Sequence, residues 1–155
     1  MTVSTTTHDT FVIVRTYDTS VASVFRAWAD PKRKARWFAG AADALDNGYE
    51  LDFQVGGHES NRGGPPGGPV YTYAAQFRDI VVDQRIVYTY EMFADDSRIS
   101  VSVATVEFHG SGGSTQLVIT EQGVFLDGHD TAAQREEGTR SLLDSLAASL
   151  TGDQP

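Results

Sequence analysis

The chain of 155 residues contains no cysteine. This absence excludes disulfide bonds, thiolate zinc sites, iron–sulfur clusters and cysteine nucleophiles. Basic residues are scarce as well: 12 Lys and Arg stand against 21 Asp and Glu, which gives a net charge of −9 at pH 7. Because this charge repels phosphate backbones and anionic lipid surfaces, we expect neither nucleic acid nor a membrane as a partner.

Long apolar runs are also missing. No run of roughly 18 apolar residues occurs, and residues 1–9 lack the basic start and the apolar middle of a signal peptide. We therefore expect a cytoplasmic protein. The 40% of hydrophobic residues that are present suffice for one compact core without a metal or a disulfide. The preference for Arg over Lys is typical of a bacterial genome rich in G and C.

Periodicity predicts the order of the first elements. We expect residues 1–9 to be disordered, and a β-branched and aromatic run predicts a strand at 11–17. Two short helices follow: Ser20 caps the first, and Asp30-Pro31 ends it and starts the second, which runs to about Phe38.

Alternating residues then predict five further strands, at 49–55, 70–82, 85–93, 98–109 and 115–123. Residues 56–69 hold six glycines and three prolines, which predicts a loop. Thr131 and Gln134 have the spacing of a capping box, and the apolar stripe that follows predicts a long helix ended by Gly152, with 151–155 as a tail. The result is a single α+β domain over 1–155, a six-stranded antiparallel sheet that curls around its last helix.

Several sequence strings are similar to those of the START-like superfamily, also called SRPBCC. They lie at 20–37, 52–57, 77–89, 105–108, 112–119 and 142–150, so the resemblance covers nearly the whole chain. Within the superfamily, the chain resembles the branch of proteins homologous to the activator of the heat-shock protein 90 ATPase. The resemblance implies a helix-grip fold, with a cavity between the concave face of the sheet and the C-terminal helix that takes hydrophobic or amphipathic molecules.

One departure from the family pattern concerns the size of that cavity. The family often has Gly-Trp at the start of the helix stripe, whereas this chain has Gly138 and Thr139. A threonine in place of an indole predicts that the cavity extends toward the first turns of the helix.

The sequence offers no constellation for catalysis or for metal binding. No Gly-x-Ser-x-Gly elbow occurs, and the four histidines are too widely spaced to form a metal pair. The glycine-rich segment leads into a strand, not a helix, so it does not form a phosphate cradle. We therefore assign no catalytic residue, no metal and no cofactor.

Aromatic side chains of shared strand parity are the candidate cavity lining. Tyrosines suit such a pocket because a buried hydroxyl needs a partner. Glu121 shares parity with Leu117 and Ile119: it either borders the cavity, where burial would raise its pKa and make it a candidate acid or base, or lies in solvent beyond the strand end. The predicted ligand-binding residues are Trp28, Trp37, Phe53, Tyr71, Tyr73, Phe77, Tyr88, Tyr90, Met92, Phe108, Glu121, Thr139, Leu142 and Leu146.

Four basic residues lie close together, at Lys32, Arg33, Lys34 and Arg36. They form either a solvated helix face, a lid over the cavity mouth or a contact for an acidic partner, and the sequence favours the solvated face.

Three functions remain open. The leading hypothesis is binding or sequestration of a small hydrophobic or aromatic molecule by a monomer or homodimer. The alternatives are a polyketide-cyclase-like or hydratase-like enzyme, and a stress-response co-chaperone that contacts a heat-shock protein 90-type ATPase. The sequence favours a binding protein because it places no acid–base pair or nucleophile.

Overall fold

The computed structural model describes residues 3–39 and 48–151. Seven strands form one antiparallel sheet in the order β1-β7-β6-β5-β4-β3-β2. The elements, in chain order, are β1 (Thr6–Tyr17), α1 (Val21–Ala29), α2 (Pro31–Phe38), β2 (Glu50–Leu51), β3 (His58–Gly63), β4 (Tyr71–Val81), β5 (Arg85–Ala94), β6 (Ser97–Ser111), β7 (Ser114–Leu126) and α3 (Ala132–Thr151).

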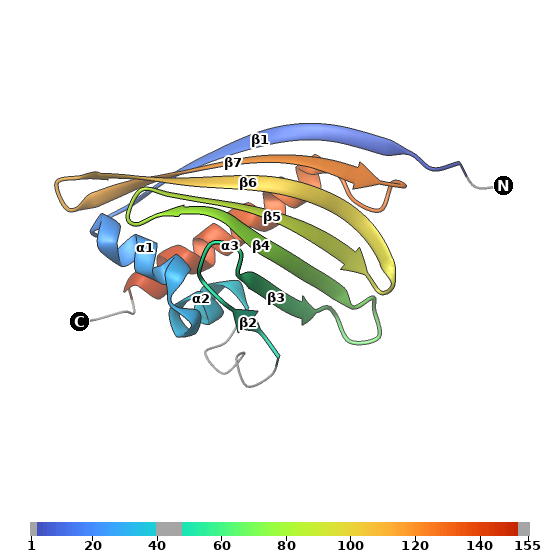
Figure 1. The fold of residues 1–155 in the computed structure, drawn as a ribbon, viewed down its shortest axis with the longest axis horizontal. Coiled ribbons are helices and arrows are strands. Elements are labelled where there is room, and N and C mark those ends of the chain that lie inside the picture. The colour runs from blue at the N-terminus through green and yellow to red at the C-terminus, as the bar shows by residue number, and fades with distance from the viewer. Residues whose placement is uncertain (1–2, 40–47, 152–155) are drawn as a thin grey trace.

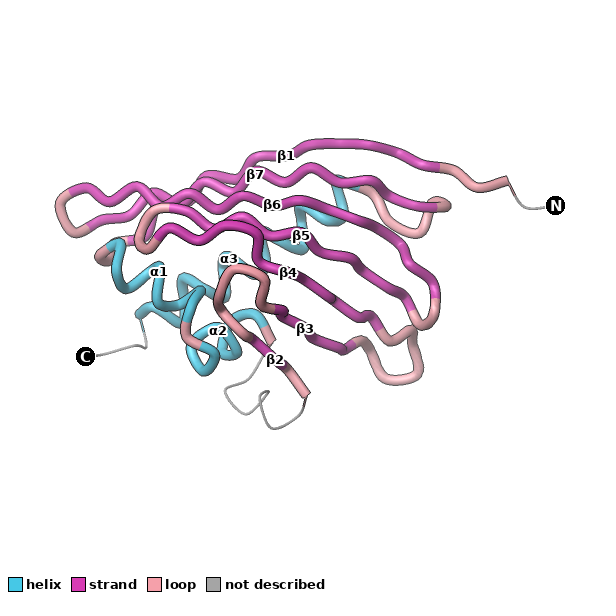
Figure 2. The backbone as a smooth tube through the Cα atoms, viewed as in Figure 1, coloured by secondary structure: helices cyan, strands magenta, loops and turns pink. Residues whose placement is uncertain are grey.

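The three helices of the described residues lie on one face of the curved sheet (Figure 1). The long helix α3 crosses behind the strands, and α1 and α2 cover the same face nearer one end, as the backbone trace also shows (Figure 2). This arrangement confirms the predicted α+β fold with two short helices after the first strand and a long C-terminal helix. None of the helices in the described part of the chain is long and apolar enough to span a membrane.

The sheet has seven strands, so the prediction of six was wrong. The expected strand at 49–55 is reduced to β2, and β3 lies inside the segment predicted to be a loop. β3 pairs with β4 from His58↔Gln76 to Gly63↔Tyr71. The polar sequence of β3 lacks the apolar alternation that predicts a strand. β3 pairs through backbone groups instead, and Glu59, its one buried side chain, binds residues of other elements.

The prediction of disorder at residues 1–9 was wrong for residues 6–9. β1 begins at Thr6 and pairs with β7 along its whole length, up to Thr6↔Leu126. Backbone pairing with a long neighbouring strand extends β1 beyond its apolar residues. The expected tail starts one residue too early, since Thr151 belongs to α3, and the predicted stop at Gly152 lies outside the described residues.

The predicted helix starts are confirmed by capping bonds. Ser20 Oγ accepts a hydrogen bond from the Ser23 backbone N–H at 3.2 Å, and Asp30 Oδ2 accepts one from the Arg33 N–H at 3.2 Å. At α3, Thr131 Oγ1 accepts a bond from the Gln134 N–H at 3.1 Å. Each bond satisfies a donor that the helix itself leaves unpaired.

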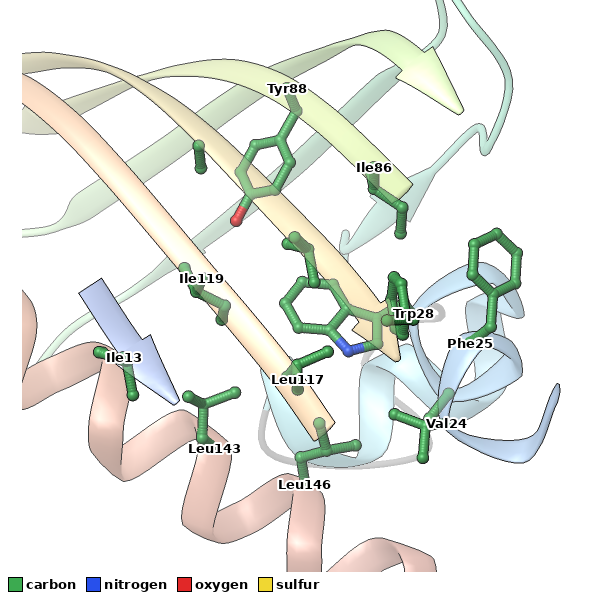
Figure 3. Packing of buried hydrophobic residues seen from close by; sticks show 14 of the residues in the cluster. Ile13, Val24, Phe25, Trp28, Ile86, Tyr88, Leu117, Ile119, Leu143 and Leu146 are labelled. Carbon is green, nitrogen blue, oxygen red and sulfur yellow. The ribbon is translucent and has the colours of Figure 1, made fainter. Parts of the chain in front are cut away.

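The core lies between the sheet and the three helices (Figure 3). Ile13 from β1 and Leu117 and Ile119 from β7 face Leu143 and Leu146 of α3, and all five side chains are at most 2% exposed. Alternation along each strand places these residues on one face, as the period of two requires. The core therefore fixes α3 against the β1–β7 side of the sheet.

A cavity between the sheet and the C-terminal helix

A cavity of about 320 Å³ lies among β3, β4, β5, β7, α1, α2 and the N-terminal part of α3. Nine of the fourteen predicted residues line it: Trp28, Trp37, Tyr73, Tyr88, Tyr90, Met92, Glu121, Thr139 and Leu142. The structure adds eight lining residues that the sequence did not indicate: Phe38, Asn61, Ile119, Asp130, Gln134, Arg135, Gly138 and Leu143. The walls are mainly aromatic and aliphatic, with a few polar groups, which is typical of a site for a small apolar molecule.

The other five predicted residues lie elsewhere. Phe53, Phe77 and Phe108 belong to an aromatic cluster around Phe25 of α1, with ring centroids 5.1–5.8 Å apart along the pairs that connect them. This cluster is packed core, because α1 covers that end of the sheet. Leu146 is fully buried beneath α3, and Tyr71 is 40% exposed because it begins β4, at the end remote from the helices.

The wall formed by α1 and α2 is held by two tryptophans. Their rings meet edge to face, with centroids 4.8 Å apart. The Trp37 indole N–H donates to the Ala27 carbonyl at 2.9 Å, which fixes the orientation of its ring. Because each helix contributes one of the two rings, this contact joins α1 to α2 at the cavity wall.

Next to this wall lies a buried ion pair. Lys34 Nζ is 3.0 Å from Glu59 Oε2, and the two residues are 2% and 1% exposed. Tyr49 and Tyr73 donate their hydroxyl groups to the same carboxylate. The ammonium group also lies over the rings of Trp28, Trp37 and Phe38, at 4.4–5.4 Å from their centroids. Paired charges and satisfied hydrogen bonds allow both groups to be buried.

This ion pair corrects the interpretation of the basic segment. Lys34 is not part of a solvated face, because it points into the interior and binds a strand that the sequence did not predict. Burial lowers the pKa of Lys34, and the charge of Glu59 opposes that effect.

A second polar network closes the other side of the cavity. The Tyr90 hydroxyl donates to Glu121 Oε2 at 2.7 Å and accepts a bond from Arg135 Nη1 at 2.9 Å. Arg135 Nη2 also bonds Ser100 Oγ and Asp130 Oδ2, each at 2.8 Å. The guanidinium lies over the ring of Tyr90, 5.5 Å from its centroid. This network ties the start of α3 to β5, β6 and β7.

Glu121 is 3% exposed, which decides between the two sequence interpretations in favour of the buried one. Burial raises the pKa of Glu121, and the Tyr90 hydrogen bond and the Arg135 charge oppose the shift. The folded protein therefore holds this proton more tightly than the unfolded chain does. Consequently, this residue's contribution to the free energy of unfolding falls as pH rises from 4.5 toward the folded-state pKa.

Replacing Glu121 with Gln tests this linkage. We expect the difference in the free energy of unfolding, wild type minus Glu121→Gln, to fall as pH rises from 4.5, because the variant cannot bind the proton. Urea unfolding of both proteins between pH 4.5 and about 8 measures the difference, in which the other titrating groups cancel. A difference that stays constant over this window contradicts a raised pKa.

The described residues contain no group of three or more His, Asp or Glu side chains able to hold an ion. All four histidines, His8, His58, His109 and His129, are exposed, and none of them lines the cavity.

Arg135 is the most informative residue that the sequence interpretation missed. It lies four residues before Thr139 and seven before Leu142, and therefore on the same helical stripe. Extending that stripe toward the N-terminus of the helix would have indicated Arg135 as a lining residue. Its partners Tyr90 and Ser100 lie on β5 and β6, so helical spacing does not predict them.

The curved antiparallel sheet, the helix that crosses it and the cavity between them define a START-like protein. The chain belongs to the family of Activator of Hsp90 ATPase homolog 1-like proteins, whose model matches residues 18–151. This confirms the resemblance found in the sequence.

Solved structures support the same assignment. Protein Mll3558 from Rhizobium loti is 47% identical, with a TM-score of 0.86 over 94% of this chain and 99% of that one. A protein from Rhizobium leguminosarum is 41% identical, with a TM-score of 0.92 over 98% and 100%. DynU16, from the dynemicin biosynthetic locus, is 17% identical, with a TM-score of 0.67 over 92% of this chain and 47% of that one, and shares the fold alone. No curated protein matches the chain.

Proposed function

We propose that this protein binds a small hydrophobic or aromatic molecule in the cavity between the sheet and α3. The observation that carries the proposal is the cavity itself: about 320 Å³ of space behind walls of Trp28, Trp37, Tyr73, Tyr88 and Tyr90. This volume is at the lower end of the range for small-molecule sites, roughly 300–1,000 Å³. Filling it would remove apolar surface of both the ligand and the protein from water.

The proposal predicts that a larger side chain at Thr139 blocks binding. Thr139 lines the cavity on α3, and an indole in its place would occupy the space that a ligand ring needs. We expect wild-type protein to bind 2-methylnaphthalene, a flat molecule without hydrogen-bonding groups, and Thr139→Trp to lose that binding. Isothermal titration calorimetry measures both affinities.

Ser141→Trp is the matched control, because Ser141 is exposed on the same helix and lies outside the cavity lining. It should bind the probe as the wild type does. Unchanged affinity in a folded Thr139→Trp protein would place binding elsewhere, and no binding to the wild type would refute the proposal.

A cyclase-like or hydratase-like enzyme is the second candidate, and Glu121 favours it. A buried carboxyl group with a raised pKa at a cavity wall suits proton transfer to or from a bound molecule. An enzyme of this kind would lose turnover in the Glu121→Gln variant. DynU16 belongs to a biosynthetic locus, which agrees with this candidate only at the level of the fold.

Contact with a heat-shock protein 90-type chaperone stays a prediction that rests on the family name. It would use the outer surface, so it is compatible with a ligand in the cavity.

A further inference from the structure

Tyr88 and Glu121, which line the cavity, have unused hydrogen-bonding capacity among the described residues. Tyr88 is 9% exposed, and its hydroxyl makes no hydrogen bond to any of those residues. Glu121 uses Oε2 to accept the bond from Tyr90, and its other oxygen, Oε1, accepts none from the described part of the chain. Buried polar groups are normally paired, so unpaired ones at a cavity indicate the position of a ligand's polar atom.

Both atoms are accessible from the cavity. In the described residues, the side-chain polar atoms that are both fully enclosed and unpartnered are Trp28 Nε1 and Ser102 Oγ. Tyr88 Oη and Glu121 Oε1 are not among them, although both residues are buried and both line the cavity. Figure 3 shows the Tyr88 ring reaching from its strand toward α3, with the hydroxyl at the far end.

The sheet register brings the two side chains to one row. Tyr88 on β5 pairs with Ala104 on β6, and Ala104 pairs with Glu121 on β7. Two interstrand spacings separate the backbones of Tyr88 and Glu121, roughly 9–10 Å in total. Because Ala104 between them is short, the polar ends can approach a common point above it. Burial raises the pKa of Tyr88, and the charge of Glu121 raises it further, which agrees with their closeness.

The chemistry of this pair selects a hydroxyl group. A carboxylate oxygen only accepts hydrogen bonds, whereas a tyrosine hydroxyl can donate one. A ligand hydroxyl can therefore donate to Glu121 and accept from Tyr88 at the same time. When Glu121 is protonated, the same hydroxyl can accept from it.

The charges around the cavity disfavour an anionic ligand. Among the described residues, the two cations nearest the lining are already paired: Lys34 binds Glu59, and the half-buried Arg135 binds Asp130. A ligand carboxylate at the row of Tyr88 and Glu121 would meet the acidic side chain without a free cation beside it, which costs free energy in a buried site.

We infer that the cavity selects an uncharged aromatic molecule with a hydroxyl group, and that this hydroxyl binds between Tyr88 and Glu121. The inference rests on the proposed function, because it assumes a ligand in the cavity. Flat rings are favoured since the surrounding walls carry six aromatic side chains: Trp28, Trp37, Phe38, Tyr73, Tyr88 and Tyr90.

Two probes of the same shape test it: 2-naphthol, which carries a hydroxyl, and 2-methylnaphthalene, which carries a methyl group in its place. The measured quantity is the affinity for 2-naphthol divided by the affinity for 2-methylnaphthalene, obtained by titration calorimetry at neutral pH. We expect Tyr88→Phe and Glu121→Gln each to lower this ratio about tenfold, because each variant weakens one hydrogen bond of the ligand hydroxyl. Affinity for 2-methylnaphthalene should change less than about twofold.

Tyr71→Phe is the matched control. It removes the hydroxyl of a tyrosine on β4 that is 40% exposed and lies outside the cavity lining. The ratio should therefore stay at its wild-type value.

The outcomes separate the two proposals. Binding of both probes with a ratio that neither Tyr88→Phe nor Glu121→Gln changes would overturn the hydroxyl site and leave the proposed cavity function intact. Tighter binding of 2-naphthoate than of 2-naphthol would also overturn it. Failure of the wild type to bind either naphthalene would refute the cavity function itself.

Discussion

Replacing Lys34 with Met should lower the free energy of unfolding by about 3–5 kcal/mol, because it leaves the Glu59 carboxylate buried without its cation. Glu59 is 1% exposed, and among the described residues only the hydroxyl groups of Tyr49 and Tyr73 would remain to stabilise its charge. Urea unfolding followed by circular dichroism measures the loss.

Two further variants identify the cause of that loss. Lys32→Met changes an exposed lysine of the same helix and should alter stability by no more than about 0.5 kcal/mol. Combining Lys34→Met with Glu59→Gln should recover most of the loss, because no unpaired charge is then buried. If Lys34→Met costs no more than Lys32→Met, the buried ion pair is not present in solution.

Leu146→Ala should lower the free energy of unfolding by about 2–5 kcal/mol. The side chain is fully buried between α3 and the sheet, so truncation leaves a void in packed core (Figure 3). Leu142→Ala on the same helix should cost less, since Leu142 is partly exposed and already borders empty space. Thermal and urea unfolding compare the two variants. An equal or larger loss for Leu142→Ala would show that α3 packs in a different rotation.

The elements with a local signal were predictable. Alternation of apolar residues located β5, β6 and β7 to within three residues at each end. Capping side chains at Ser20, Asp30 and Thr131 located the helix starts, because such bonds involve residues close in sequence.

What the sequence did not predict depends on contacts between distant residues. β3 forms because β4 offers its edge, and Glu59 is tolerated inside because Lys34, 25 positions away, turns inward to meet it. Likewise, Arg135 reaches Tyr90, which is 45 positions distant. Neither partner can be identified from composition or periodicity.

The candidate site was predictable in kind and only partly in detail. Shared parity correctly placed Tyr73, Tyr88 and Tyr90 on the face toward the helices. Parity does not say how far along a strand the helices extend, so it could not separate the cavity from the packed aromatic core around Phe25 or from the exposed strand end at Tyr71.

The location of a bound probe tests the central claim most directly. Isotope-filtered nuclear Overhauser spectra of the labelled protein with unlabelled 2-naphthol report which side chains lie against the rings. The account predicts contacts to Tyr88, Ile119 and Leu142, which line the cavity. Contacts confined to a second, more open hollow on the sheet, lined by His8, Val101 and Val124 among others, would contradict it.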